Sequence, residues 1–378
     1  MSSDPRRVLY VRVDGCFGGP ERHILTLLKH IDRSRFEPVV APMVSEGGLA
    51  ESARELGVPV AFVPMPTRLS VPSARKVLTE IIQEYGIDLV HTYGIRSNLV
   101  AGPLAKRHKL PWVARVPNLN YTDYGNRLIG WFFHFLNNRL LRQADAVQVI
   151  STPLRDYFAS LGNPPERLEL IPNGIDLPTP PSSELRDDSR QYYGIDDAQI
   201  VIGSLGRVEQ IKGYDQLLYC IPHLPADTVV LIGGEGSESA TLMQEARVLD
   251  VANRFKLVGF VQDIRFFLAA CDLYVQPSYS EGVPSAMLEG MAMSLPVVAT
   301  KVGGIEDVIR DEEDGILVPP GDRSALLKQL TMLCEDREKR VFLGERARGR
   351  VEEVGSAEKM TRRIETLYDS LLSDRQNT

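Results

Sequence analysis

The 378-residue sequence contains few cysteines and no long apolar run. Its four cysteines lie far apart and include no Cys-x-x-Cys pair, which argues against a disulfide framework or a zinc site. We expect reduced thiols that mostly serve packing: Cys16, Cys220, Cys271 and Cys334. No apolar run reaches the roughly 18 residues needed to span a bilayer, and the N-terminus has no signal-peptide core. These absences predict a soluble protein of the cytoplasm.

Two phosphate-binding motifs are also absent. No Asp-x-Asp triplet occurs, so a divalent metal is not needed to explain phosphate binding, and we expect no metal and no other cofactor. The glycine loop at residues 14–21 follows the first expected strand but is not the dinucleotide fingerprint Gly-x-Gly-x-x-Gly. Its Gly18 and Gly19 let the backbone approach a ligand, although such a pair is often only a tight turn.

Charge is unevenly distributed along the chain. The net charge is −7, but residues 1–175 carry 21 Lys and Arg against 16 Asp and Glu, which is +5. Residues 176–378 carry 22 against 34, which is −12. A basic first half favours an anionic acceptor molecule or an anionic membrane surface, and a solvated surface without a partner is an equal alternative. No nucleic-acid partner is expected.

Short apolar segments alternate with helical patterns along the whole chain. In the first half the expected strands are Val8–Val13, Pro38–Ala41, Val60–Val63, Leu89–His91, Trp112–Ala114 and Ala146–Ile150. In the second half they are Val201–Leu205, Val229–Ile232, Lys256–Val258, Leu273–Gln276, Val297–Ala299 and Ile316–Val318. Such alternation predicts parallel sheets covered by helices on both faces, with ligands at the carboxyl ends of the strands.

A stretch rich in Pro, Ser and Asp near the middle of the chain predicts a domain boundary. We predict an N-terminal Rossmann-like domain at residues 1–175, a linker at 176–190 and a C-terminal Rossmann-like domain at 191–355. Residues 356–378 are predicted to form a helix that crosses back to the first domain. The expected fold class is therefore α/β, with two doubly wound domains that face a central cleft.

The stretch Leu273–Thr300 predicts a strand, a turn-rich loop, a helix from Pro284 and a second strand. With proline at the helix start, the next two amides lack intrahelical partners and can bind an anion or a polar ligand. Glu281 in the loop and Glu289 in the second helical turn bracket this position. A pair of ordinary surface glutamates is the alternative.

Two cations, Arg207 and Lys212, follow the first strand of the second half and lie five residues apart around a turn. A guanidinium fork and a point charge at a strand end suit a diphosphate, although each residue alone is more typical of a solvated surface. Glycine-rich turns after the next two strands, at Gly234 and before Val261, let the backbone pass close to a ligand such as a flat base. Plain turns are the alternative for both.

Five segments stand out together. They are GGPERH (Gly18–His23), IPNGID (Ile171–Asp176), GRVEQIKG (Gly206–Gly213), GGEG (Gly233–Gly236) and EGVPSAMLEGMA followed by PVVAT (Glu281–Ala292 and Pro296–Thr300). Their combination resembles the retaining glycosyltransferases of family 4, which have the GT-B fold. The resemblance spans nearly the whole chain; the second half matches in order and spacing, and the first half mainly in the glycine loop.

The resemblance implies a role for each matching residue. Arg207 and Lys212 match the diphosphate pair, Glu281 matches the carboxylate beside the transferred sugar, and Glu289 matches the carboxylate that binds the ribose hydroxyls. The other expected donor-binding residues are Gly18, Gly19, Gly234, Val261, Val283, Pro284, Ser285 and Ala286. We expect Glu281 to orient the sugar and support its positive charge, and not to act as a covalent nucleophile.

The activity that the resemblance implies is retaining sugar transfer from a nucleotide-diphosphate sugar, held mostly by the second domain, to an acceptor held mostly by the first. A UDP-sugar is favoured over a GDP-sugar. The acceptor is a hydroxyl of a glycan or a lipid-linked molecule, in cell-surface polysaccharide or glycolipid synthesis. The reaction needs no metal ion.

The chain departs from the family at two places. Where the family often has Val-His-Gly, this sequence has Val116-Pro117-Asn118, so the histidine that usually touches the sugar is absent. The identity of the donor sugar and the handling of the proton therefore stay open. His91 and Asn118 are kept as candidate acceptor-binding residues, with a satisfied core position as the alternative for His91. Ser294 stands where a glycine is usual.

Three other functions share parts of this pattern. A GT-B sugar-nucleotide epimerase needs acid and base carboxylates in the first domain, and the sequence offers no convincing set. A GT-B phosphorylase needs a lysine that carries pyridoxal phosphate, and nothing marks one. A non-catalytic two-domain protein that binds a sugar or a nucleotide sugar would also close over its ligand. The periplasmic sugar-binding kind would need a signal peptide, which the sequence lacks, and would not need paired phosphate-binding cations.

Residues 127–142 predict a helix with apolar residues on two sides. Ile129, Phe133, Leu136 and Leu140 form a stripe that packs to the sheet, whereas Leu128, Trp131 and Phe135 lie beside Arg139 and Arg142. Such a helix suits peripheral contact with the inner face of the cytoplasmic membrane or with a lipid-linked acceptor. Burial under the other domain or in a dimer is the alternative, and the oligomeric state stays open.

Overall fold

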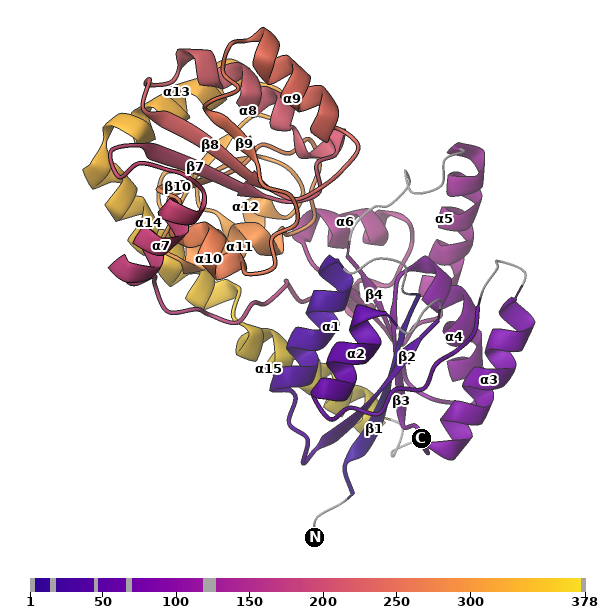
Figure 1. Ribbon diagram of the computed structural model, residues 1–378. Helices are drawn as coiled ribbons and strands as arrows, with labels where there is room; N and C mark the ends of the chain where they lie inside the picture. The colour runs from indigo at the N-terminus through magenta and orange to yellow at the C-terminus, as the bar shows by residue number, and fades with distance from the viewer. Residues whose placement is uncertain (1–3, 14–17, 44–46, 66–69, 118–126, 375–378) are drawn as a thin grey trace. The chain divides into compact units, whose positions relative to one another are not determined.

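The computed structural model describes residues 4–13, 18–43, 47–65, 70–117 and 127–374, with only the backbone described at 127–133. The chain forms two compact units. One unit comprises Met1–Gly174 together with Ala357–Thr378, and the other comprises Ile175–Ser356. Each unit contains a six-stranded parallel sheet (Figure 1), which confirms the predicted α/β class.

The sheet of the first unit has the strand order β2-β1-β3-β4-β5-β6. Its strands are β1 (Arg6–Arg12), β2 (Phe36–Pro42), β3 (Leu89–Tyr93), β4 (Trp112–Val116), β5 (Ala146–Val149) and β6 (Leu168–Leu170). Its helices are α1 (Gly19–His30), α2 (Gly48–Glu55), α3 (Val71–Glu84), α4 (Ile95–Arg107), α5 (Arg127–Leu141), α6 (Thr152–Ser160), the 3-10 turn η1 (Pro165–Arg167) and α15 (Ala357–Asp374). In Figure 1, α1 and α2 lie on one side of this sheet and α3 and α4 on the other. Strands covered on both faces need nearly continuous apolar sequence, which Val8–Val11 provide in β1.

The strand order of the first unit reverses between β1 and β3. From β1 the chain moves outward to β2, returns to the other side of β1, and continues outward through β3 to β6. In doubly wound sheets, ligands bind beside the carboxyl ends of the two strands at such a switch point. Arg12 and Tyr93 are the last residues of β1 and β3, and they are paired in register.

The hydrophobic core of the first unit joins the sheet to α1 and to α15. Ile364 and Tyr368 of α15 are fully buried in one cluster with Tyr10 of β1. At the rim, Glu365 of α15 pairs with Arg35 at 3.3 Å. Each large side chain buried in this way stabilises the fold by about 1.5–3 kcal/mol. Helix α15 therefore belongs to the first unit, although it is far in sequence from the other elements of that unit.

The sheet of the second unit has the strand order β12-β11-β10-β7-β8-β9. Its strands are β7 (Ile200–Leu205), β8 (Thr228–Gly233), β9 (Phe255–Leu257), β10 (Leu273–Gln276), β11 (Val297–Thr300) and β12 (Ile316–Val318). Its helices and 3-10 turns are α7 (Ser183–Tyr192), η2 (Gln210–Lys212), α8 (Tyr214–Cys220), η3 (Ile221–His223), α9 (Ser239–Val248), α10 (Ile264–Ala269), α11 (Ser285–Ala292), α12 (Ile305–Val308), α13 (Arg323–Glu335) and α14 (Arg337–Val354). Here the strand order reverses between β7 and β10, which places the second switch point.

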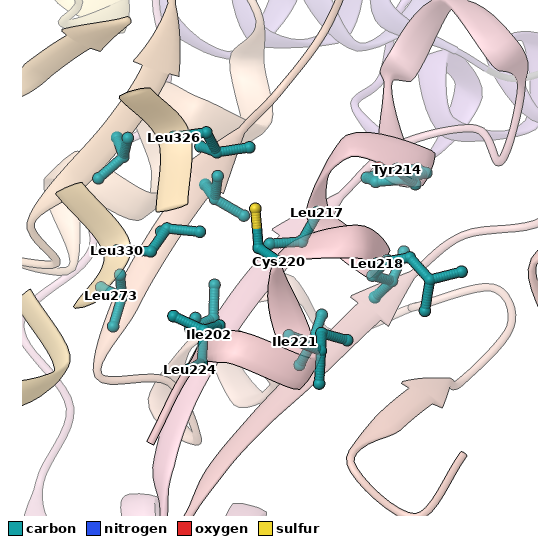
Figure 2. Packing of buried hydrophobic residues seen from close by; sticks show 14 of the residues in the cluster. Ile202, Tyr214, Leu217, Leu218, Cys220, Ile221, Leu224, Leu273, Leu326 and Leu330 are labelled. Carbon is teal, nitrogen blue, oxygen red and sulfur yellow. The ribbon is translucent and has the colours of Figure 1, made fainter. Parts of the chain in front are cut away.

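Apolar side chains from α8 and α13 cover one face of the second sheet. Figure 2 shows Leu217 and Cys220 of α8 and Leu326 and Leu330 of α13 in one cluster with Ile202 of β7. All five are at most 2% exposed. This packing holds the start of α8, and with it the loop after β7, in a fixed position on the sheet.

Three of the four cysteines are buried free thiols, as expected: Cys220, Cys271 and Cys334. Burial raises the thiol pKa of Cys220 and of Cys334 to about 11. These groups are therefore protonated near neutral pH, and they act as small apolar side chains. Cys16 lies outside the described residues.

The linker predicted at 176–190 is too long, because Ser183–Tyr192 form α7. The Ser182 hydroxyl accepts a hydrogen bond of 3.2 Å from the Leu185 amide and caps this helix. The buried Arg190 guanidinium donates to the Gln199 carbonyl at 2.6 Å, which fixes the helix to the start of β7. Serines cap and begin this helix, and Asp187 and Asp188 lie within it, so a composition typical of a linker does not mark a linker here.

Three further details differ from the sequence predictions, and a fourth explains a departure from the family pattern. Val60–Val63 is not a strand, since only an isolated bridge forms there, at Val60. Leu168–Leu170 form an unpredicted strand, β6, which has only three residues. Helix α11 begins one residue later than expected, at Ser285, with Pro284 as its N-cap. Ser294 adopts a left-handed conformation with φ +61°, which explains why glycine is usual at this position.

Candidate functional site

The site predicted in the second unit lies at its switch point. β7 and β10 pair directly, with Leu273 opposite Ile202. Arg207 and Lys212 follow the carboxyl end of β7, and Glu281 follows the carboxyl end of β10. The topology therefore brings the two loops that carry these three residues to one edge of the sheet.

Lys212 and Glu281 form an ion pair in which Nζ lies 2.7 Å from Oε1. The side chains are 17% and 10% exposed, so the pair is largely shielded from water. Gly213, with φ +66°, permits this approach, because a Cβ there would clash with the carbonyl oxygen of Pro277. Gln216 donates a hydrogen bond of 2.8 Å to the same carbonyl. The loop after β7 is thus fixed to the loop after β10.

One oxygen of Glu281 receives three hydrogen bonds. Besides Lys212, the Ser278 hydroxyl donates to Oε1 at 2.6 Å and the Gln276 amide donates to it at 2.8 Å. The Tyr274 hydroxyl donates in turn to Gln276 Oε1 at 3.0 Å and so orients that amide. Oε1 is therefore saturated, whereas Oε2 makes no hydrogen bond with the part of the chain that the structure describes.

Sequence reasoning did not find the residues that orient Glu281. Tyr274, Gln276 and Ser278 are all fully buried. They alternate along β10 and the residues after it, so their side chains share one face. This alternation of polar groups at the end of an otherwise apolar strand was the available signal.

The backbone at Glu281 is held by the turn after β11. Gly303 has φ +58°, and a Cβ there would clash with the Glu281 carbonyl oxygen. The amide of Gly304 donates to the Gly282 carbonyl at 2.8 Å. Gly303 and Gly304, which the sequence did not mark as site residues, therefore position the backbone of the loop that carries Glu281.

The start of α11 lies directly after this loop. Val283 and Pro284 are buried, whereas Ser285 and Ala286 are partly exposed. No side chain caps the helix, and the first amide bonded back along it is that of Leu288, which donates to the Pro284 carbonyl. The preceding helical amides are therefore arranged to bind a ligand oxygen.

Glu289 lies in the second turn of α11 and is partly buried. Burial raises the pKa of the Tyr274 hydroxyl well above its usual range, and the charges of Glu281 and Glu289 raise it further. Both carboxylates therefore act on one buried tyrosine, which stays neutral as a hydrogen-bond donor. The structure thus brings the two predicted glutamates to the same region.

Arg207 is exposed, unlike Lys212. Its guanidinium makes no ion pair or hydrogen bond with the described residues. The nearby Glu209 is occupied elsewhere: hydrogen bonds from the Ser237 hydroxyl (2.8 Å) and amide (3.3 Å), and then the charge of Arg207, lower the pKa of its carboxyl. Of the two predicted cations, Arg207 is therefore the one directly open to a ligand.

Gly234 and Val261 have packing roles that need no ligand. Gly234 has φ +138°, and a Cβ there would clash with the Gly206 carbonyl oxygen. Its amide donates to the Gly259 carbonyl at 2.7 Å. The Val261 side chain fills the space beside Gly233. These contacts explain the residue types, and binding to a donor stays a prediction for both.

In the first unit, Gly18 is the N-cap of α1, and its amide donates to Glu21 Oε2 at 3.0 Å. Glu21 is fully buried and pairs with Arg12 at 2.6 Å. Gly19 is the first helical residue, and a Cβ there would meet no atom of the described residues within 4 Å. Packing against that part of the chain therefore does not require glycine at this position.

His91 is fully buried in the core of the first unit. Its Nδ1 lies 2.7 Å from the Tyr368 hydroxyl of α15, and its ring lies 4.6 Å from that of Tyr93. Burial, together with the charge of Arg115, lowers the His91 pKa to about 3. The structure thus gives His91 the buried core position that was the alternative reading. Asn118, the other acceptor candidate, lies outside the described residues.

The described residues lack two further features. They contain no group of three or more His, Cys, Asp or Glu side chains that could hold a metal ion. None of their helices is long and apolar enough to cross a membrane. In α5, the side chains of Leu128, Ile129, Trp131 and Phe133 lie outside the described residues, whereas Phe135 is 55% exposed.

Two sequence families match the chain. The family described as Glycosyl transferases group 1 matches residues 186–350, which include every predicted site residue of the second unit. The family described as Glycosyl transferase 4-like domain matches residues 18–174 of the first unit. Together the two matches cover most of both sheets.

Relatives with known activities extend over most of the chain. N-acetyl-alpha-D-glucosaminyl L-malate synthase of Bacillus anthracis is 26% identical over 305 residues, which are 79% of this chain and 79% of that protein. The GDP-mannose-dependent alpha-(1-6)-phosphatidylinositol monomannoside mannosyltransferase of Mycolicibacterium smegmatis is 27% identical over 78% of this chain and 79% of its own.

Solved structures share the fold. HepE of Anabaena, in complex with UDP and glucose, has a TM-score of 0.85 and 21% identity, covering 97% of this chain and all of that one. WaaG, a glycosyltransferase involved in lipopolysaccharide biosynthesis, has a TM-score of 0.74 and 17% identity, covering 94% and 98%.

The two doubly wound parallel sheets and these structural likenesses define the GT-B class of fold. The family matches take the identification further. The chain belongs to the GT-B glycosyltransferases with group 1 and 4-like domains, and it is a glycosyltransferase. This confirms the family predicted from the five sequence segments.

Proposed function

We propose that the protein moves a sugar from a nucleotide-diphosphate sugar to a hydroxyl of a glycan or lipid-linked acceptor, with retention of anomeric configuration and without a metal ion. The observation that carries the proposal is the Lys212–Glu281 ion pair at the second switch point, with the exposed Arg207 on the same sheet edge. Two cations next to a fixed carboxylate suit a nucleotide-diphosphate sugar. The cations bind the anionic diphosphate, and the carboxylate stabilises the positive charge that the sugar ring gains in the transition state.

Phosphate binding falls to Arg207, Lys212 and the first amides of α11. The diphosphate gains charge as its bond to the sugar breaks, so these donors stabilise the transition state more than the bound substrate. Loss of one such donor typically costs about 3 kcal/mol of transition-state stabilisation. In this arrangement the donors supply the positive charge that a metal ion provides in other enzymes, and full turnover after EDTA treatment is the expected result.

Glu281 faces the sugar with a single oxygen. Three hydrogen bonds hold Oε1, which fixes the direction of the carboxylate and leaves Oε2 for the ligand. A carboxylate held in this way orients a sugar hydroxyl and stabilises positive charge on the ring as the diphosphate departs. The acceptor hydroxyl then attacks from the face that the diphosphate leaves and passes its proton to the departing phosphate oxygen, so the configuration is retained without a covalent sugar–Glu281 intermediate.

The donor that we propose is a UDP-sugar, with a GDP-sugar as the alternative. HepE, which shares the fold, was solved with UDP and glucose, whereas the mannosyltransferase relative is named for GDP-mannose. Incubating the protein with each sugar nucleotide and measuring its thermal unfolding discriminates between them, because a bound donor stabilises the folded state by mass action. The largest shift identifies the base and the sugar.

The reaction is tested by measuring release of the nucleoside diphosphate with and without an acceptor. A transferase releases it in step with glycosylated product, an epimerase changes the sugar without release, and a binding protein does neither. Proton NMR of the product then reads the anomeric configuration. An inverted product overturns the retaining assignment, and release without any product overturns the transferase proposal.

For the acceptor, we propose that α5 contributes peripheral contact with a membrane or with a lipid-linked molecule. Two described residues support this proposal: Phe135 is 55% exposed, and Arg139, one turn later, is exposed. An apolar ring beside a cation suits the interface of an anionic bilayer. Co-sedimentation with anionic liposomes at low salt tests it. Equal recovery of wild-type and Phe135→Ser protein in the pellet would contradict it.

A further inference from the structure

A row of polar side chains crosses the first sheet at its carboxyl edge. Arg12, Tyr93, Arg115 and Gln148 are successive register partners on β1, β3, β4 and β5. Residues paired in register on parallel strands point to the same face, so these four side chains lie side by side. Tyr93, Arg115 and Gln148 are at most 1% exposed.

This row begins with Arg12 and Tyr93 at the switch point of the first unit, next to α1, and continues over β4 and β5. The His23 ring of α1 lies 5.7 Å from the Tyr93 ring. The Arg115 guanidinium lies over the same tyrosine, 5.6 Å from the ring centre. Arg12 pairs with Glu21 of α1 at 2.6 Å. The Arg12–Tyr93 end of the row therefore lies where doubly wound sheets bind their ligands, and Arg115 stands next to it.

Several buried polar atoms of the row have no hydrogen-bond partner within the described part of the chain. They are Nε and Nη1 of Arg115, the Tyr93 hydroxyl, both amide atoms of Gln148 and both ring nitrogens of His23. Only Nη2 of Arg115 is satisfied, by Asn173 Oδ1 at 2.6 Å. Buried polar groups in native proteins are almost always paired. Such a concentration of unpaired groups at a ligand-binding edge indicates a polar ligand.

The charge of the row identifies the ligand as an anion. Arg12 has Glu21 as its counter-ion, whereas no described carboxylate lies within ion-pair distance of Arg115. Burial lowers the Arg115 pKa to about 10, which leaves it charged at pH 7. Burial, with the charge of Arg115, also lowers the pKa of His23 well below its usual range, so this neighbour is neutral. An isolated buried cation is unfavourable, and a carboxylate or phosphate supplies both the charge and the acceptor atoms.

We propose that Arg115, with Gln148 and Tyr93 beside it, binds a carboxylate or phosphate group of the acceptor. This inference rests on the proposed function, in which the first domain holds the acceptor. It narrows the acceptor to a molecule that carries an anionic group near the hydroxyl that receives the sugar. Arg115 acts in binding and takes no part in breaking the bond to the diphosphate.

The first experiment measures anion binding without catalysis. Inorganic phosphate is titrated into the Arg207→Ala/Lys212→Ala double variant, which lacks the two phosphate-binding cations proposed for the second unit. Thermal unfolding is recorded. At ten times its Kd, phosphate should raise the Tm by about 4 °C. Introducing Arg115→Met into the double variant should abolish the rise in Tm. Introducing Arg54→Met, which replaces an exposed arginine of α2, should leave the rise unchanged. A rise that survives Arg115→Met, or no rise in the double variant, overturns the proposal.

Folding of the Arg115→Met variant is checked in a protein that keeps both Arg207 and Lys212. UDP or GDP should still raise the Tm of Arg115→Met, because the second unit binds it. Should Arg115→Met fail to fold, Gln148→Leu and Arg115→Lys take its place. Both should weaken phosphate binding at least tenfold, and unchanged binding in both contradicts the proposal.

The second experiment separates this inference from the proposed function. Glycosyl transfer is measured to L-malate and to inositol 3-phosphate, with glycerol and myo-inositol as neutral counterparts. The anionic molecules should be the better acceptors, and Arg115→Met should raise their KM at least tenfold. Transfer that is equally fast to neutral acceptors overturns the anion site but leaves the transferase assignment intact. When none of these small acceptors is glycosylated, the phosphate titration alone decides whether the anion site exists, and the proposed function is decided by release of nucleoside diphosphate with glycan and lipid-linked acceptors.

Discussion

At the switch point of the second unit, Glu281 receives three hydrogen bonds on one oxygen, and Lys212 already has its counter-ion. One strand away from the switch point of the first unit, on β4, Arg115 has two nitrogens without a partner and no described carboxylate within ion-pair distance. Both places are the carboxyl edge of a doubly wound sheet. The difference indicates two ways of preparing for a ligand: the second unit fixes its groups in advance, and the first obtains missing interactions from the molecule that it binds.

Removing the fixed carboxylate should have the largest effect. Glu281→Gln keeps the size of the side chain but removes its charge, which leaves Lys212 without a counter-ion and the sugar without its electrostatic partner. We expect kcat to fall about 100- to 1000-fold. Steady-state release of nucleoside diphosphate measures this. Glu335→Gln, an exposed glutamate at the end of α13, is the control, and a loss of less than threefold in Glu281→Gln contradicts the preorganised site.

The backbone behind the carboxylate should be the next most sensitive position. Gly303→Ala places a Cβ against the Glu281 carbonyl in a left-handed conformation, whose backbone cost alone is about 1–2 kcal/mol. We expect a total loss of at least about 2 kcal/mol in the free energy of unfolding. Urea denaturation of the variant measures it. Gly349→Ala, in the middle of α14 with open space around its Cβ, should instead stabilise by about 0.5–1 kcal/mol.

Much of the fold was predictable because its signals are local. Apolar strands such as Leu273–Gln276 were found at their true bounds, since a parallel sheet buried on both faces leaves a continuous apolar run. The three-residue strand Leu168–Leu170 was missed because so short a run carries little pattern. Helix α7 was mistaken for linker because its caps have the composition of a loop.

The candidate site was predictable only in part. Arg207, Lys212 and Glu281 carry charge in recognisable loops, and the strand order places those loops together. The hydrogen bonds of Gln276 depend on the rotamer of its side chain and on how the strands pair. Neither can be predicted from a single segment of the sequence. The unpaired state of Arg115 is likewise visible only in three dimensions, since its sequence context, Ala114 to Val116, reads as an ordinary strand.

A smaller effect should follow from releasing Glu281 on one side. Gln276→Leu removes one of the three hydrogen bonds and lets the carboxylate rotate, while Lys212 and Ser278 still hold it. We expect kcat to fall about tenfold, as for a net loss of roughly 1.4 kcal/mol, with little change in affinity for the nucleoside diphosphate. Gln244→Leu on the exposed side of α9 should have neither effect. A raised KM with unchanged kcat would show that Gln276 serves binding alone.

The smallest effect concerns the neutral histidines of the first unit. The His91 pKa is about 3 in the folded protein and 6.5 when unperturbed, so the unfolded state takes up the proton first as the pH falls. The free energy of unfolding therefore falls as the pH drops through about 6.5. His91 accounts for a loss of about 0.7 kcal/mol between pH 7 and pH 6. His91→Asn should remove that part of the pH dependence in urea denaturation. An unchanged slope would show that His91 is protonated in the folded protein.

The central claim is that the edge between β7 and β10 binds a nucleotide-diphosphate sugar and transfers its sugar. The most direct measurement is release of nucleoside diphosphate by the wild type and by Arg207→Ala and Lys212→Ala, each with the donor that stabilises the wild type most and a working acceptor. We predict that the wild type releases it only with acceptor present and that each variant loses about 100-fold or more in kcat. Wild-type turnover in both variants would contradict the assignment of this site.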